Sequence, residues 1–379
     1  MDRQLLVILS PLIIRDLHLD QTRFGLLISA FSIAYAATSL GTGWLLDKAG
    51  INKAISLAVG WWSTAAACTA FTRGLVGLGI CRAALGVGES AGVPAVGKLN
   101  GIYLKPEERA LGAAANQIGL SLGGIIGPLW IGVAVANGWR LPFVVTGLMG
   151  FIWIPLWLSV NRLIPAHYAT QELAPTRGIR EFSLLRDRSL LLLVIVNVLW
   201  MGGYSLWSNW TTLYLVHVHH LTLQQTARYV WIPPFVSNVG GFFGGWLSLH
   251  WIRRGQDAVS ARRRAIGFSA LGFLLTLLLP LAPDAAWATV IISVSFFFSL
   301  AGSVNIYALP IDIFGPARSG LAIAALTCSY GILQTVISPI IGFLGDHHLY
   351  TEVSWLVTIP LLLALLFLRP FRESRAIRT

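Results

Sequence analysis

Residues 77–100 read GLGICRAALGVGESAGVPAVGKLN, a stretch long and apolar enough to cross a membrane that nevertheless contains Arg82, Glu89 and Lys98. A charge at bilayer depth costs at least ~2.5–3.5 kcal/mol on insertion scales, so such residues normally face a protein interior or a water-filled cavity. Arg82 and Glu89 are nearly two helical turns apart, which places both on one helix face, ~10 Å apart along the axis. Lys98 points roughly the opposite way, and we expect its long side chain to reach the membrane surface.

The composition of the whole chain indicates a helical membrane protein. Of its 379 residues, 55% are hydrophobic and 11% are charged, whereas a soluble domain has about 25% charged residues. The apolar residues form blocks of about 20 or more between short polar links, which predicts an all-α polytopic fold. Cys68, Cys81 and Cys328 lie inside apolar blocks without metal-ligand spacing, so we expect no metal site, no disulfide framework and no cofactor.

The hydropathy pattern predicts twelve spans, the first of them incomplete. They cover residues 1–15, 22–46, 53–72, 76–103, 109–136, 141–161, 189–216, 223–249, 265–283, 286–311, 319–345 and 350–368. The longest polar link separates an N-terminal bundle over residues 1–162 from a C-terminal bundle and short basic tail over residues 189–379. Within this cytoplasmic linker, residues 163–188, the stretch GIREFSLLRDR can form an amphipathic helix on the inner membrane surface.

The positive charge is distributed as a topology signal. The net charge is +11, and most Lys and Arg residues fall in alternate links, which the positive-inside rule assigns to the cytoplasm. The chain is therefore expected in the inner (plasma) membrane with cytoplasmic termini, and no nucleic-acid partner is needed. This topology requires the first span to rise from the cytoplasm, but residues 1–15 cover only ~22 Å of a ~30 Å core. We therefore expect the sequence to lack the start of its first helix.

The link after the second span, residues 43–53, reads GWLLDKAGINK and is expected to latch one conformation of the protein. Gly43 and Gly50 permit a close helix approach and a tight turn. Asp47, beside Lys48 and Lys53, can make a charge-assisted contact with a neighbouring helix. The alternative is an ordinary polar loop.

Two patterns resemble the major facilitator superfamily. The link has the form G-x-x-x-D-[KR]-x-G of the loop between helices 2 and 3, and Arg82 opens a run, R-x-x-L-G-x-G, that looks like the helix 4 motif. The resemblance therefore groups Arg82 with the latch. The equivalent second-half link, GGWLSLHWIRRG, has Leu249 where the superfamily usually has Asp, so a latch acid is missing there.

Longer stretches are similar to the anion:cation symporter family, whose members carry hexuronates, galactonate and glucarate. They are SAFSIAYAATSLGTGWLLDKAG, CRAALGVGESAGVPAVGK, KPEERALGAAANQIGLSLGGIIGP, GWRLPF, FSLLRDRSL, IDIFGPARSG and ISPIIGFLGD. The resemblance implies two six-helix bundles and proton-coupled symport of an organic anion, such as a sugar acid, by alternating access. The implied partners are a small organic anion, protons and the lipid bilayer, and we expect a monomer that is not an enzyme.

The charged residues of the first and fourth spans are the main site candidates. By resemblance, Arg3 binds the substrate carboxylate, for which a guanidinium is a suitable fork, and Asp2 carries a proton. Glu89 is the second proton-coupling candidate, because burial favours the protonated form of a carboxyl. The alternatives are that Arg3 only contacts the membrane interface and that Glu89 forms a permanent structural pair with Arg82 on the same face.

Neutral polar and aromatic residues supply weaker candidates for substrate contacts. Amides and ring faces can bind sugar hydroxyls and sugar rings, but amides also join membrane helices and Trp also marks the membrane interface. The candidates are Tyr35, Asn116, Gln117, Trp207 and Asn305. Clustered histidines such as HVHH at residues 217–220 are expected to be exposed loop residues.

Two other functions fit the same chain. A proton-coupled drug or metabolite efflux antiporter of the same superfamily needs a buried acid in a cavity without Arg3. A membrane sensor or structural protein needs no intramembrane charges, so Arg82 and Glu89 argue against it.

Overall fold

The computed structural model describes the chain except for residues 104–118, 120–121, 164–179 and 372–379. The chain divides into two compact units, Met1–Ile179 and Arg180–Thr379. This boundary lies inside the linker predicted over residues 163–188. Every regular element in the described ranges is a helix, which confirms the all-α fold predicted from the hydropathy pattern.

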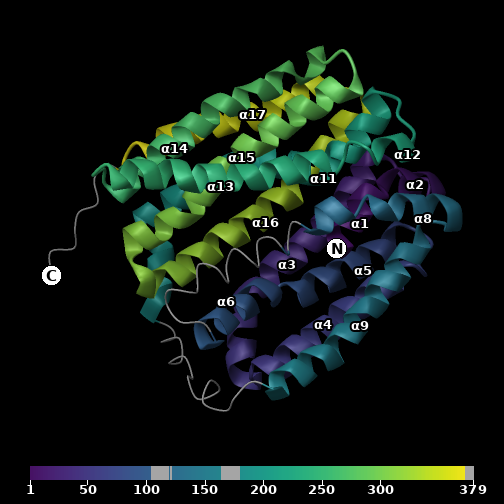
Figure 1. Ribbon diagram of the computed structural model, residues 1–379, viewed down its shortest axis with the longest axis horizontal. Coiled ribbons are helices and arrows are strands. Elements are labelled where there is room, and N and C mark those ends of the chain that lie inside the picture. Colours follow the sequence, from purple (N-terminus) through teal and green to yellow (C-terminus); the bar gives the residue numbers. More distant parts are fainter. Residues whose placement is uncertain (104–118, 120–121, 164–179, 372–379) are drawn as a thin grey trace. The chain divides into compact units, whose positions relative to one another are not determined.

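Unit 1 contains long helices that follow the predicted spans closely. Within it, α3 lies beside α5 and α4 lies beside α9 (Figure 1). Gly50, at a φ of 76°, forms the tight turn between α3 and α4 that the link sequence predicts. The described helices of this unit are α1 (Asp2–Ile8), α2 (Ser10–Asp16), α3 (Gln21–Ala49), α4 (Ile51–Thr69), α5 (Leu75–Glu89), α6 (Gly92–Tyr103), α8 (Leu129–Asn137) and α9 (Arg140–Leu163).

Two predicted spans of unit 1 are broken at prolines. The span predicted over residues 76–103 is not one helix, because α5 ends at Glu89 and α6 begins at Gly92. Pro94 has no N–H to donate to the Ser90 carbonyl, so the helical ladder cannot continue there. The first span is likewise divided, into α1 and α2. Because Pro11 has no N–H for the Val7 carbonyl, that carbonyl accepts a hydrogen bond from the Ser10 hydroxyl at 2.7 Å instead. The stretch Leu75–Asn100 is nevertheless long and apolar enough to span a membrane, as predicted, with the interruption inside it.

Unit 2 contains the predicted second-half spans with local differences. The linker stretch expected as an amphipathic helix is a 3₁₀ turn, η1, and the spans predicted over 223–249 and 265–283 are each divided into two elements. The described elements are η1 (Arg180–Arg186), α11 (Arg188–Val218), α12 (Leu223–Thr226), α13 (Ile232–Arg253), α14 (Ala258–Phe273), η2 (Leu274–Leu281), α15 (Ala285–Phe314), α16 (Pro316–Asp346) and α17 (Tyr350–Leu368).

Glycines bring one helix pair of each unit into close contact. A Cβ at Gly86 of α5 would clash with the Phe31 carbonyl of α3. In unit 2, a Cβ at Gly240 or Gly244 of α13 would clash with the backbone of α15. Small residues allow such close packing between membrane helices, where lipid gives no hydrophobic drive for association.

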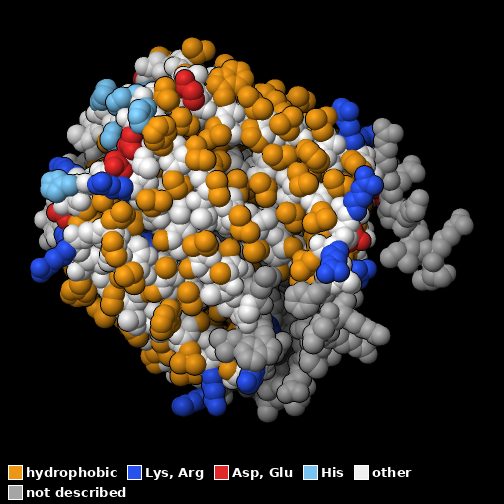
Figure 2. Space-filling view, turned by 180° about the vertical axis from the view of Figure 1, so that it is seen from behind, with side chains coloured by type: hydrophobic (Ala, Val, Ile, Leu, Met, Phe, Trp, Pro, Cys, Tyr) orange, Lys and Arg blue, Asp and Glu red, His pale blue; other side chains and the backbone are white. Residues whose placement is uncertain are grey.

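The surface is that of a membrane protein. Among the described residues, seven helical segments are long and apolar enough to span a bilayer. Large apolar side chains such as Leu57, Phe71 and Trp246 are exposed. Hydrophobic side chains cover most of the face in Figure 2, whereas charged and His side chains gather towards its edges. The chain is therefore a multi-pass membrane protein.

Candidate functional site

Unit 1 brings Arg3 of the first predicted span together with Glu89 and Arg82 of the fourth. Arg3 of α1 donates from Nε to the Glu89 carboxylate at the end of α5, which forms an ion pair between residues far apart in sequence. The Arg3 side chain is 43% exposed and the Glu89 side chain 17% exposed, so the pair is partly accessible. Two residues that sequence analysis assigned to anion binding and to proton coupling thus contact each other directly.

Phe31 of α3 lies against two guanidinium groups. Its ring centroid is 4.4 Å from Cζ of Arg3 and 5.0 Å from Cζ of Arg82. Tyr35, one turn further along α3, stacks on Phe31 at 5.8 Å and also lies 4.7 Å from Cζ of Arg3. A ring face attracts a desolvated cation by up to ~2 kcal/mol, so these aromatics can hold two like charges close together. Phe31 was not predicted, because a phenylalanine in an apolar span carries no signal of such a role.

Arg82 has no anionic partner in the described part of the chain. Arg82 is only 4% exposed, and its Nε has no hydrogen-bond partner among the described residues. The structural pair considered between Arg82 and Glu89 is therefore a wrong expectation, because Glu89 pairs with Arg3. One carboxylate oxygen of Asp2, Oδ1, is also buried without a hydrogen-bond donor among the described residues. Among the described residues, the cluster thus holds a guanidinium that makes no ion pair and a carboxylate with one unsatisfied oxygen.

The predicted latch lies at the other end of α3 from this cluster. Phe31, beside Arg82, precedes Lys48 by ~25 Å of helix at 1.5 Å per residue, so Arg82 is remote from the α3–α4 link. Lys48 and Lys53 are exposed. Gly43 lies within α3, and the side chain of Asp47 lies outside the described residues.

Lys98 contacts α3 near the predicted latch. Its Nζ donates to the Leu46 carbonyl at 3.1 Å, in the last turn of α3. A cation is favourable at a helix C-terminus, where carbonyls lack intrahelical partners. Lys98 thus joins α6 to the last turn of α3, and its reach to the membrane surface stays a prediction.

The weaker substrate candidates have different surroundings. Tyr35 belongs to the charged cluster, whereas Asn116 and Gln117 lie outside the described residues. Asn305 is fully buried, and its Nδ2 lies 2.9 Å from the carbonyls of both Gly244 and Ala301, so its observed contacts join α15 to α13. Trp207 is 3% exposed inside unit 2. Both residues are buried in this structure, and their contact with substrate stays a prediction.

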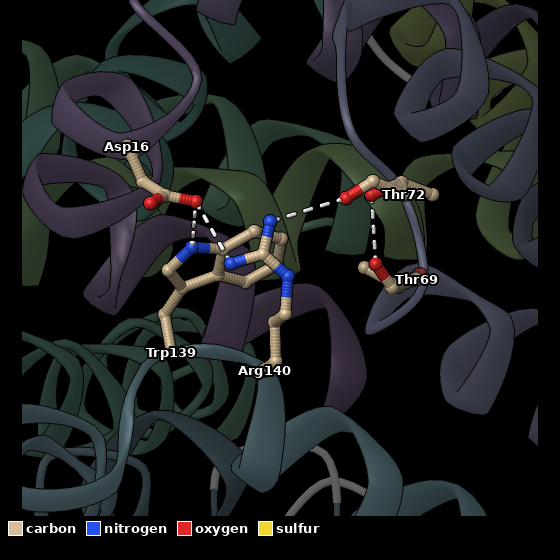
Figure 3. Close-up of polar contacts among 5 residues, drawn as sticks. All are labelled: Asp16, Thr69, Thr72, Trp139 and Arg140. Atoms are coloured by element: carbon tan, nitrogen blue, oxygen red, sulfur yellow. Dashed lines mark hydrogen bonds and ion pairs between the residues drawn. The ribbon is translucent and has the colours of Figure 1, made fainter.

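A second polar cluster, absent from the predicted site, joins the ends of α2, α4 and α9. Oδ2 of Asp16 accepts hydrogen bonds from the Trp139 indole at 3.0 Å and from the Arg140 guanidinium at 2.8 Å (Figure 3). Arg140 also donates to the Thr72 carbonyl at 3.3 Å. These donors lower the pKa of the Asp16 carboxyl, with the indole hydrogen bond as the largest cause. The cluster ties three helix ends together.

Comparisons with known proteins agree with this architecture. The family model described as Major Facilitator Superfamily matches residues 1–256. The "Probable sulfoacetate transporter SauU" of Cupriavidus necator is 28% identical, over 97% of this chain and 90% of the relative. The "Hexuronate transporter" of Bacillus subtilis is 26% identical, over 85% and 84%, and that of Escherichia coli is 22% identical, over 89% and 82%.

A solved structure shows the same fold. It is a bacterial homolog of the human lysosomal transporter Spinster in an inward-facing, unoccupied conformation, with a TM-score of 0.78 and 18% identity, covering 99% of this chain and 95% of that one. The relatives named here are transporters, and this chain is likewise a transporter and not an enzyme. Because the family model covers more than half of the sequence, the chain belongs to the Major Facilitator Superfamily.

Proposed function

We propose that the chain is a secondary active transporter of the inner membrane that takes up an organic anion, of the sugar-acid class, together with protons. The observation that carries this proposal is the Arg3–Glu89 ion pair inside a membrane-spanning unit, with Arg82 buried nearby and in no ion pair with any described residue. Such charges are expensive in a membrane and are normally functional. The printed names of the relatives, hexuronate and sulfoacetate transporters, support an organic anion as substrate.

Competition for Arg3 can couple the anion to protons. A carboxylate substrate and the Glu89 carboxylate are chemically equivalent acceptors for the Arg3 fork. Protonation of Glu89 removes its negative charge and frees Arg3 for the substrate. Arg82 adds a second positive charge to the same cluster, and Asp2 is a second proton-binding candidate because one of its oxygens lacks a donor. Neutralised carboxylates also reduce the charge penalty when the loaded carrier changes conformation.

The latch has a separate part in this proposal. The α3–α4 link, with Gly43, Asp47, Lys48, Gly50 and Lys53, stabilises one of the two access states. Lys98 belongs with this group, because it holds the last turn of α3 through the Leu46 carbonyl. Arg82 belongs instead with the charged cluster beside Phe31.

The efflux of a cationic drug fits the site less well. A cation entering the cluster would meet the guanidinium groups of Arg3 and Arg82, both on the face of Phe31. Like charges in contact with each other repel strongly where water is scarce. The substrate charge that matches the cluster is negative.

Purified full-length protein in proteoliposomes tests the proposal. We expect an inward proton gradient to drive accumulation of D-glucuronate or sulfoacetate above its external concentration, and Glu89→Gln to abolish this accumulation. Glu352→Gln, at an exposed carboxyl in the first turn of α17, is the matched control and should leave accumulation unchanged. Undiminished accumulation by a folded Glu89→Gln variant would reject the assignment of proton coupling to Glu89.

A further inference from the structure

Ser90 and Ala91 form the joint between α5 and α6, directly after Glu89. This joint leaves backbone carbonyls without helical partners. Across it, the Ser90 amide donates to Gly86 at 3.2 Å and the Ala91 amide to Gly88 at 3.4 Å, and the regular pattern resumes when Ala95 donates to Ala91 at 3.0 Å. The Ser90 carbonyl would accept from position 94 in a continuous helix, but Pro94 has no N–H. A buried carbonyl in a membrane needs another donor.

Helix α3 supplies that donor. The Thr42 hydroxyl lies 3.3 Å from the Ser90 carbonyl, and it shares its proton with the Ser39 carbonyl of its own helix at 2.9 Å. One turn earlier, the Thr38 hydroxyl lies 3.0 Å from Oγ of Ser90, which itself donates to the Val87 carbonyl at 2.7 Å. Ser90 is fully buried and Thr42 is nearly so. Two hydroxyls of α3 thus contact the single residue that follows Glu89.

The same helix also holds the partner of Glu89. Phe31 and Tyr35 of α3 contact the Arg3 guanidinium, and Thr38 and Thr42 lie on the following turns of α3. Both members of the ion pair are therefore positioned by one helix, Arg3 through ring faces and Glu89 through the joint. Among the residues that the structure describes, the charged or titratable groups around Glu89 are Arg3 and Asp2 on α1, Tyr35 on α3 and Arg82 on α5.

We propose that Thr42, assisted by Thr38, is a positioning residue for Glu89. The Thr42 hydroxyl binds the Ser90 carbonyl that Pro94 leaves free. This contact fixes where the Glu89 carboxylate meets Arg3. Because the Thr42 hydroxyl has a second acceptor in the Ser39 carbonyl, it can release the joint without becoming unsatisfied. The joint can then move when Glu89 binds a proton. This inference rests on the proposed proton-coupled function.

Substitution of Thr42 in the full-length protein tests the inference. Thr42→Val keeps the side-chain shape and removes the hydroxyl, whereas Thr42→Ser keeps the hydroxyl. We expect Thr42→Val to lower the maximal rate of proton-driven D-glucuronate uptake about fivefold to tenfold, the effect of about one hydrogen bond. It should also shift the pH profile of uptake and leave KM within about twofold, because Thr42 acts through Glu89 and not through the substrate.

The conservative variant and a matched threonine provide the controls. Thr42→Ser should restore the wild-type rate and pH profile. Thr64→Val removes a hydroxyl that donates to the i−4 carbonyl of Gly60 at 2.8 Å on an exposed face of α4, and should change neither. A folded Thr42→Val variant with the wild-type rate and pH profile would overturn the proposal.

Pro94→Ala gives a second test that does not depend on the Thr42→Val variant alone. The new N–H at position 94 can donate to the Ser90 carbonyl, so Thr42→Val should have little further effect in this background. Equal losses from Thr42→Val with and without Pro94→Ala would contradict the proposed role of the Ser90 carbonyl. Likewise, Thr42→Val should leave the rate of substrate exchange nearly unchanged in the Glu89→Gln background.

Hydrogen–deuterium exchange separates a failure of this inference from a failure of the proposed function. Peptides that contain residues 88–96 should exchange faster in Thr42→Val than in the wild type or in Thr64→Val. If wild-type uptake does not respond to a proton gradient, the proposed function is wrong, whereas unchanged exchange at the joint shows that Thr42 does not hold it.

Discussion

Each unit has a helix pair that glycines bring into close contact, but the polar side chains beside the two pairs differ. In unit 1, Gly86 brings α5 against α3, and the polar groups beside this contact are the charges of Arg3, Arg82 and Glu89. In unit 2, Gly240 and Gly244 bring α13 against α15, and the amide of Asn305 joins the two helices through the Gly244 carbonyl.

Several buried hydrogen bonds between helices of unit 2 are neutral. The Trp200 indole donates to the Ser299 carbonyl at 2.9 Å, and Asn197 donates to the Leu326 carbonyl at 2.8 Å. Unit 2 also has an ion pair, between Arg262 near the start of α14 and Asp312 near the end of α15, whose side chains are 21% and 16% exposed. Neutral hydrogen bonds join membrane helices at a modest cost, whereas mid-span charges are retained for function. The proton and anion chemistry that we propose therefore belongs to unit 1, whereas the hydrogen bonds of Trp200, Asn197 and Asn305 join helices of unit 2.

The largest expected effect comes from Arg3. Arg3→Gln should lower uptake about 10-fold to 100-fold, because it removes the proposed fork for the substrate carboxylate and a hydrogen bond to a charged group contributes about 1.5–3 kcal/mol. The measurement is the initial rate of D-glucuronate uptake per folded protein. Arg15→Gln, at an exposed arginine at the end of α2, is the control and should retain uptake. Retained uptake in Arg3→Gln would remove the functional distinction between the units.

Substitution of Arg82 should lower substrate affinity without lowering the stability of the protein. Since the buried guanidinium has no anionic partner in the described residues, Arg82→Gln should leave the thermal unfolding midpoint unchanged or raise it. Substrate affinity should fall about tenfold, the effect of losing a favourable charge interaction of ~1.4 kcal/mol. Thermal unfolding and equilibrium binding of D-glucuronate measure the two effects. A large loss of stability would mean that Arg82 is a structural residue like Asn305.

Substitution of Asn305 should lower the stability of the protein without changing KM for uptake. Asn305→Leu removes the hydrogen bonds to the Gly244 and Ala301 carbonyls and should destabilise the protein by about 1–2 kcal/mol. KM for uptake should stay within about twofold, because the amide is buried between α13 and α15 and does not contact the substrate. A selective rise in KM would show instead that Asn305 binds substrate.

The smallest effect is expected at the polar cluster around Asp16. The donors from Trp139 and Arg140 lower the pKa of Asp16 in the folded state, so the cluster stabilises the fold above the ordinary Asp range. That contribution should be lost as the pH falls below about 4 and through the lower folded-state pKa. Since the ion pair is nearly half exposed, Asp16→Asn should cost less than about 1 kcal/mol at neutral pH. Thermal unfolding of both proteins as a function of pH measures the difference, which should vanish in acid.

The sequence predicts the spans well because hydropathy is a local property. It also identifies Arg3, Glu89 and Arg82 as unusual, since charges inside apolar blocks are visible without a structure. It does not show that Glu89 pairs with Arg3 and not with Arg82, because that depends on how α1 packs against α5.

Other features escape the sequence for the same reason. Phe31 looks like any apolar residue, although it contacts two guanidiniums. Lys98 has a long side chain, and only the position of α3 shows that it contacts the Leu46 carbonyl. Asp16 and Trp139 are distant in sequence, so no local pattern relates them.

The central claim is that Glu89 and the substrate compete for Arg3. Equilibrium binding of D-glucuronate to the purified protein, measured from mildly acidic to mildly basic pH, tests it most directly. Wild-type affinity should fall as the pH rises, whereas Glu89→Gln, which mimics the protonated side chain, should bind as tightly as the wild type in acid with a much flatter pH dependence. A Glu89→Gln variant that retains the wild-type pH dependence would contradict the account.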